Sequence, residues 1–149
     1  MTEYISLEQI KKTSDLIQAQ SAHRPKIGMI LGSGLGLLAD EVENADYVEY
    51  SQIPYWPEST VEGHSGQLVI GNLEGQSVVV MQGRAHYYEG YSFNQTSILI
   101  DLFKTFNPEL CIITNSSGCL NLKWDLGNFY IYCSISIFRS VKWVLIPTN

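Results

Sequence analysis

The 149-residue sequence has few charged residues, and no apolar run in it reaches the length that crosses a bilayer. Only 16% of the residues are charged and 45% are apolar, a balance typical of a folded globular chain and not of a disordered one. The first twenty residues lack the basic start and apolar run of a signal peptide. We therefore expect a cytoplasmic protein that does not act at a membrane.

Cysteine and basic residues are also scarce. Cys111, Cys119 and Cys133 are odd in number and lack CxxC spacing, which favours reduced thiols over a disulfide framework or a zinc cluster. The chain carries 9 Lys and Arg against 15 Asp and Glu, a net charge of -6. Such a surface repels nucleic-acid phosphates, so we expect no nucleic-acid partner. Locally basic sites are still compatible with this total.

Acidic residues are missing from the last 24 positions, because all of them fall at or before Asp125. Residues 129–137 form a continuous strand-like run, and 144–146 form a second apolar run near the end. Two interpretations stay open: a buried terminal strand, or a truncated or shifted reading frame. We expect the chain to divide into residues 1–127 and a divergent or truncated tail, 128–149.

Strand and helix patterns alternate along the first 115 residues. Two capping boxes, Ser6 to Gln9 and Ser92 to Gln95, each precede an amphipathic helical pattern. Apolar runs predict strands at 26–31, 67–73, 77–81 and 110–115, the middle two joined as a hairpin through Glu74-Gly75. The alternation predicts an α/β fold with a mixed central sheet flanked by helices.

A glycine-rich turn, Gly32-Ser33-Gly34-Leu35-Gly36, follows the first predicted strand. Backbone N–H groups in such a turn can hold an anion, and Ser33 adds a hydroxyl. It is neither a Walker A loop, which needs a following Gly-Lys-Ser/Thr, nor a clean dinucleotide fingerprint, because Leu37 replaces the last glycine. A plain tight turn is the alternative.

Residues 83–91 concentrate Arg, His and aromatic side chains after another strand. The alternate spacing of Arg84 and His86 predicts that both point to one face of the strand end. An arginine fork and a histidine donor suit phosphate, and Glu89 can orient His86. The alternative is a surface ion pair among exposed tyrosines.

Two further segments carry polar groups. His64 lies between glycines and, taken singly, reads as a solvated histidine, whereas residues 115–118 can form a second anion-binding turn. Three of these four segments follow strands, and ligands of open α/β sheets gather at the carboxyl ends of strands. The sequence therefore predicts one shared phosphate pocket.

Four ordered motifs carry a family resemblance. They are Ile30 to Gly36, Ser59 to Gly66, Met81 to Tyr91 and Thr114 to Gly118. Over about residues 26–127 the chain resembles the trimeric purine nucleoside phosphorylases, so a phosphorylase-type fold with its C-terminal part missing is implied. The implied reaction is phosphorolysis, in which a purine (deoxy)ribonucleoside and phosphate give free base and (deoxy)ribose 1-phosphate. Phosphate is a co-substrate, and neither a metal nor another cofactor is implied.

The resemblance also implies roles for single residues. Phosphate would be bound by Ser33, His64, Arg84 and His86 and by the backbone at Ala85 and Ser116. His86 and Glu89 would be the catalytic pair, Glu89 holding His86, and Tyr88 would contact the ribose. A homotrimer is implied for the full-length family.

The sequence departs from the family pattern at three places. Ala85 stands where an aromatic residue is common, and Ser116-Ser117-Gly118-Cys119 replaces Ala-Ala-Gly-Gly. After Gly127 the family pattern is lost, and the residues that read the purine and the ribose 5′-hydroxyl have no counterpart. We therefore expect a purine nucleoside phosphorylase fragment with impaired activity; the alternatives are a methylthioadenosine phosphorylase and a non-catalytic phosphate-binding remnant.

Overall fold

The computed structural model describes residues 5–57, 66–125, 127–132, 136–137 and 143–144. The chain forms two compact units, Met1–Ser116 and Ser117–Asn149, and each is considered by itself. The second unit contains one short antiparallel pair, β6 (Ser136–Ile137) and β7 (Trp143–Val144). The predicted division after residue 127 stays a prediction.

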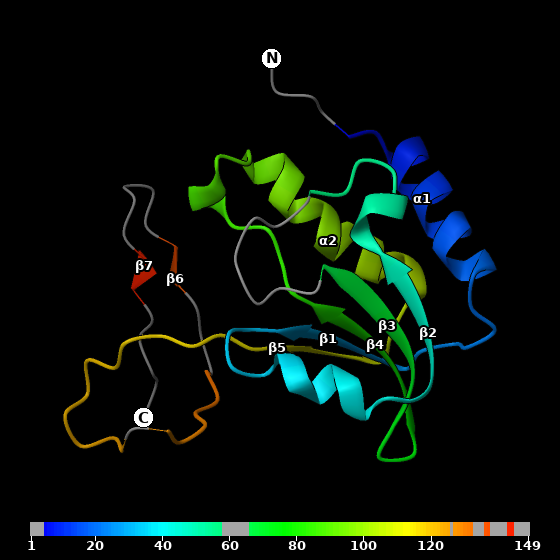
Figure 1. Ribbon diagram of the computed structural model, residues 1–149. Coiled ribbons are helices and arrows are strands. Elements are labelled where there is room, and N and C mark those ends of the chain that lie inside the picture. The colour runs from blue at the N-terminus through cyan, green and yellow to red at the C-terminus, as the bar shows by residue number, and fades with distance from the viewer. Residues whose placement is uncertain (1–4, 58–65, 126, 133–135, 138–142, 145–149) are drawn as a thin grey trace. The chain divides into compact units, whose positions relative to one another are not determined.

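The first unit is built on a five-stranded sheet of order β2-β3-β4-β1-β5 (Figure 1). Its strands are β1 (Ile27–Leu31), β2 (Glu43–Glu49), β3 (Gln67–Leu73), β4 (Gln76–Gln82) and β5 (Leu110–Ile113). β1 runs parallel to both β4 and β5, whereas β2, β3 and β4 pair antiparallel. The predicted mixed α/β sheet is thus confirmed.

Both predicted capping boxes start helices: α1 (Leu7–Ala19) and α2 (Phe93–Phe106). The Ser6 hydroxyl accepts from the Gln9 N–H at 3.2 Å, and the Gln9 side chain accepts from the Ser6 N–H at 2.7 Å. Ser92 and Gln95 repeat this exchange at 3.3 and 2.9 Å. No helix in the described part of the chain combines the length and apolarity that a membrane span needs.

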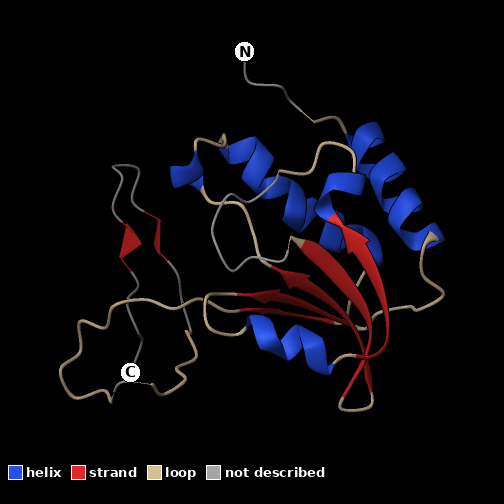
Figure 2. Cartoon of the chain, viewed as in Figure 1, coloured by secondary structure: helices blue, strands red, loops and turns tan. Residues whose placement is uncertain are grey.

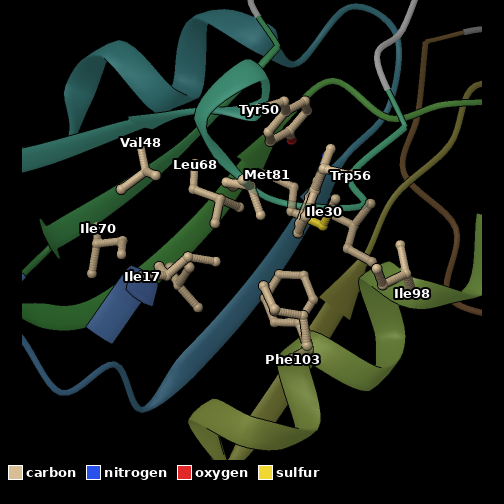
Figure 3. Close-up of a cluster of buried hydrophobic side chains, with 13 residues drawn as sticks. Ile17, Ile30, Val48, Tyr50, Trp56, Leu68, Ile70, Met81, Ile98 and Phe103 are labelled. Atoms are coloured by element: carbon tan, nitrogen blue, oxygen red, sulfur yellow. The ribbon is translucent and has the colours of Figure 1, made fainter. Parts of the chain in front are cut away.

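The helices cover the two faces of the sheet unequally (Figure 2). α1 and α2 lie on one face over a core that includes Ile17, Ile30, Leu68, Ile70, Met81, Ile98 and Phe103 (Figure 3). The other face carries a smaller core of Met29, Leu31, Ala39, Val42, Val69, Val78 and Val80, where the 3₁₀ helix η1 (Gly36–Glu41) packs. Alternate residues of β4 serve the two cores, as the two-residue period of a strand requires.

Three sequence predictions need correction. β2 was not predicted, because only Val48 of its seven residues is buried and charged side chains dominate it. The predicted strand at 129–137 is wrong for residues 129–132, which form no strand. Among the other described residues of that range, 136–137 form a short strand. The strand at 110–115 ends earlier, at Ile113.

Candidate anion-binding pocket

Three parallel strands end at one edge of the sheet. β4, β1 and β5 are neighbours and run in the same direction, so the residues that follow them come together. Gly32 follows β1, Gly83 follows β4, and Thr114 follows β5. The predicted convergence of three motif segments at strand ends is confirmed.

A cavity of about 200 Å³ lies where these segments meet. Its lining residues are Leu31, Gly32, Ser33, Arg84, His86, Tyr88, Asn115 and Ser116. This volume is below the roughly 300–1,000 Å³ of typical ligand pockets, so it suits a small ion better than a whole nucleoside. Among the described residues that line it there is no carboxylate, whereas Arg84 supplies a fixed positive charge.

The glycine turn is fastened to the end of β5 through Thr114. The Thr114 hydroxyl accepts from the Gly32 N–H at 2.9 Å and donates to the Ile30 carbonyl at 3.1 Å. A Cβ on residue 32 would lie 2.7 Å from both Asn115 Cα and the Thr114 carbonyl oxygen. Glycine is therefore required here by the close approach of two backbones.

The same turn leaves two donors for a ligand. The Gly32 N–H is occupied by Thr114, so it is not available to an anion. In the part of the chain that the structure describes, the N–H groups of Ser33 and Gly34 make no hydrogen bond. Gly34 has a φ of 90°, a conformation that side-chain-bearing residues rarely adopt. The turn thus offers consecutive backbone donors of the kind that bind anions.

Arg84 reaches the pocket by a different route from the one predicted. β4 ends at Gln82, and Gly83 turns the chain with a φ of 97°, so Arg84 and His86 follow the strand and do not alternate along it. Both nevertheless line the cavity. Among the described residues, no carboxylate or carbonyl pairs with the Arg84 guanidinium. The alternative of a surface ion pair at Arg84 is therefore wrong for this part of the chain.

A short turn positions His86. The Glu89 carboxylate accepts from the His86 N–H at 2.6 Å, and the Glu89 N–H donates to the His86 carbonyl at 3.0 Å. These bonds close the 3₁₀ helix η3 (Tyr87–Glu89). The ring of Tyr88 stacks on that of His86, with centroids 4.7 Å apart and planes 12° from parallel. Tyr88 is 75% exposed, so it covers His86 from the solvent side.

The remaining predicted site residues differ in their placement. Ser116 lines the cavity, and Ala85 is buried beside it without lining it. His64 lies outside the described residues. The structure therefore brings together Ser33, Arg84, His86, Tyr88 and Ser116, and their roles toward phosphate and ribose stay predictions.

Asn115, which belongs to the predicted anion-binding turn 115–118, lines the pocket together with Ser116. Sequence reasoning assigned no role to three other residues around the pocket. Thr114 fastens the glycine turn, and the Tyr50 hydroxyl donates to the Gly83 carbonyl at 2.8 Å. Gln82 is the third, with its side chain bonded to η1. Gln82 had a detectable signal, because a lone amide ends an otherwise apolar strand run. Tyr50 had none, since its partner lies 33 positions away.

Comparisons with known proteins agree with this architecture. The family model of the phosphorylase superfamily matches residues 26–138. Purine nucleoside phosphorylase 1 of Geobacillus stearothermophilus is 49% identical over 122 residues, which are 82% of this chain and 44% of that protein. The purine nucleoside phosphorylase of Rattus norvegicus is 37% identical over 131 residues, or 88% and 45% of the two chains.

Solved structures give the same result. Schistosoma mansoni purine nucleoside phosphorylase in complex with inosine superposes with a TM-score of 0.77 at 39% identity, covering 86% of this chain and 44% of that one. A purine nucleoside phosphorylase in complex with ribose-1-phosphate gives 0.77 at 41% identity, covering 85% and 46%. The chain thus spans less than half the length of these relatives. On its matched residues, its sheet and its motifs, it belongs to the phosphorylase superfamily, with purine nucleoside phosphorylases as its relatives.

Proposed function

We propose that this chain supplies the phosphate-binding part of a purine nucleoside phosphorylase site. The observation that carries the proposal is the Arg84 guanidinium, which has no partner among the described residues and lines a small cavity whose described lining contains no carboxylate. Ser33, His86 and Ser116 line the same cavity. An unpaired guanidinium beside hydroxyl and backbone donors is a favourable place for a phosphate dianion.

The proposed reaction uses this anion as the nucleophile. A phosphate oxygen forms a bond to C1′ while the C1′–N bond breaks. The electron pair of the C1′–N bond leaves with the purine, which takes up a proton. Positive charge develops on the ribose, as in glycoside hydrolysis, and the bound dianion stabilises it. Arg84 and the turn at Ser33 would hold the phosphate, and His86, fixed by the Glu89 turn, would donate to it.

Tyr88 is assigned to the ribose in this proposal. Its ring stacks on His86 and is largely exposed, so one face is available to a substrate that lies over the phosphate. His64 and the backbone at Ala85 complete the proposed phosphate ligands. We expect no metal and no organic cofactor, a cytoplasmic location, and a homotrimer for the full-length protein.

Activity of the chain taken alone is expected to be small. It spans 44–46% of the relatives' length, and none of its residues is assigned here to the purine. Without help to the leaving base, the rate should fall by about 10²–10⁴, the usual contribution of general acid catalysis.

A hybrid enzyme tests the proposal directly. Residues 26–127 of this chain would replace the equivalent residues of the Geobacillus stearothermophilus relative, and phosphorolysis of inosine and of methylthioadenosine would be measured. We expect inosine turnover that Arg84→Ala lowers by about 10²–10³, the scale for losing one charge-stabilising donor. A soluble, trimeric hybrid in which Arg84→Ala changes nothing would refute the assignment.

The matched control for Arg84→Ala is Lys26→Ala. Lys26 is also a cation next to β1 but precedes the strand, at the opposite edge of the sheet, where it makes an exposed 3.8 Å ion pair with Glu109. Its removal should leave turnover within about twofold, because exposed ion pairs contribute little.

A further inference from the structure

Gln82 is a buried polar residue that follows the apolar run 78–81 of β4. It is the last residue of β4 and is 6% exposed. Its neighbours in the sheet are Leu31 on β1 and Gln67 on β3. An amide in such a position is stable only if its hydrogen-bonding groups have partners, so its contacts show what it connects.

The Gln82 amide makes three hydrogen bonds. Its Nε2 donates to the Gly36 carbonyl at 3.0 Å and to Asp40 Oδ1 at 3.3 Å. Its Oε1 accepts from Gln67 Nε2 at 2.7 Å. Both amide hydrogens and one oxygen lone pair are thereby used, and the Gln67 donor fixes which way the amide faces.

These contacts join the two walls of the pocket. Gly36 ends the glycine turn that carries Ser33, and it also begins η1. Gln82 itself precedes Arg84 by two residues. The Gln82 side chain is thus a direct link between the turn that offers backbone donors and the segment that carries the guanidinium.

The glycine turn has a second fixed point at its other end. Thr114 binds the Gly32 N–H, and the Leu35 N–H donates to the Gly32 carbonyl at 3.2 Å. Residues 33–35 are consequently held between Thr114 on one side and Gln82 on the other. The turn's position relative to Arg84 depends on both attachments.

We propose that Gln82 is a positioning residue that sets the distance between the Ser33 turn and Arg84, and so the affinity for phosphate. The inference rests on the proposed function, because it needs phosphate as the ligand of this pocket. Gln82 does not line the cavity, so its effect is exerted through the backbone. Small displacements of positioned groups cost about tenfold to a hundredfold in the interactions they serve.

Two variants of the 149-residue chain test this role. Gln82→Glu keeps the size but places an acceptor against the Gly36 carbonyl and the Asp40 carboxylate, and Gln82→Met removes the polar group. We expect either to weaken inorganic phosphate binding, measured calorimetrically, by about tenfold or more. Amide hydrogen exchange of residues 33–38 should rise at the same time. Gln76→Glu, exposed at the other end of β4, is the matched control and should change neither.

The outcomes separate this inference from the proposed function. If Gln82 variants bind phosphate like the unmodified chain while Arg84→Ala weakens binding, the function stands and the positioning role is overturned. If the unmodified chain binds no phosphate, the proposed function fails. Unchanged amide hydrogen exchange of residues 33–38 in the Gln82 variants would show that Gln82 does not hold the glycine turn, and would overturn the positioning role.

A milder variant covers the case in which Gln82 variants do not fold. Asp40 is exposed, and Asp40→Ala removes one of the three hydrogen bonds of the amide. Phosphate binding should then weaken by about two- to fivefold, in keeping with the loss of one ordinary hydrogen bond. An affinity that equals that of the unmodified chain would count against the proposal.

Discussion

At the scale of single residues, Tyr50 and Gln82 together hold the backbone that leads into Arg84. Tyr50 donates to the Gly83 carbonyl from a buried position next to Trp56, whose ring centroid lies 4.7 Å away (Figure 3). Burial raises the pKa of the Tyr50 phenol above its ordinary value of 10.0, because the phenolate would lose its hydration. The hydroxyl therefore stays a donor throughout the neutral range.

Removing the Tyr50 hydroxyl should change the pH dependence of the free energy of unfolding above neutral pH. Tyr50→Phe leaves the Gly83 carbonyl without its donor and should lower the free energy of unfolding by about 1–3 kcal/mol at pH 9. Above about pH 10 the unfolded chain loses the Tyr50 proton that the folded chain keeps, so the Tyr50 contribution falls by about 1.4 kcal/mol per pH unit. Urea unfolding at pH 9 and pH 11 measures both effects.

The free energies of unfolding of Tyr50→Phe and of the unmodified chain should therefore become more alike as the pH rises from 9 to 11. Tyr47→Phe is the control, because it removes the same phenolic hydroxyl from a side chain that is 55% exposed. A stability difference between Tyr50→Phe and the unmodified chain that is the same at both pH values would contradict this account.

The sequence identified some residues of the site, but not the way in which they reach the pocket. Arg84, His86 and Ser33 stood out because an arginine, a histidine and a hydroxyl followed apolar strands, and that signal is local. The route by which Arg84 reaches the pocket was not predictable, since the strand ends at Gln82 and Gly83 turns with a positive φ. Tyr50 was missed because its partner is distant in sequence. Gln82 was marked as an amide that ends an apolar run, but the partners that give it a role are also distant in sequence.

At the scale of elements, the approach of β1 to β5 depends on Gly32. A Cβ there would meet the backbone of 114–115, whereas a Cβ on Gly36 would meet nothing within 4 Å. We expect Gly32→Ala to separate the two strand ends, destabilise the fold by about 1–3 kcal/mol and abolish phosphate binding. Gly36→Ala should be nearly neutral in both respects.

Denaturant unfolding and phosphate titration of the two alanine variants provide the measurement. Their comparison isolates the close approach, because both substitutions add one methyl group to the same turn. Equal effects from the two variants would show that the contact between Gly32 and Thr114 does not shape the pocket.

Elements with strong local signals were predicted well. The two capping boxes and the Glu74-Gly75 hairpin, with φ values of 49° and 73°, are set by nearby residues. β2 lacks such a signal, because it is an edge strand whose Glu43, Asp46 and Glu49 discourage further pairing. Residues 129–132 show the opposite error, since β propensity alone does not make a strand without a pairing partner.

At the scale of the whole molecule, the fold accounts for one small pocket at the carboxyl ends of three strands. The sheet brings three strand ends together in the first unit, and the cavity there is small and cationic. The relatives are more than twice as long as the part that matches this chain. Phosphate binding is the property that we predict for this cavity.

A phosphate titration of the 149-residue chain, followed by the backbone amide resonances, tests this claim most directly. We predict saturable binding in which the amides of Ser33, Gly34 and Ser116 shift together, and binding that Arg84→Ala weakens by about tenfold to a hundredfold while Lys26→Ala does not. Added inosine should shift few resonances beyond these. Absence of saturable binding, or shifts that spare residues 33–34 and 84–86, would contradict the assignment of this pocket to phosphate.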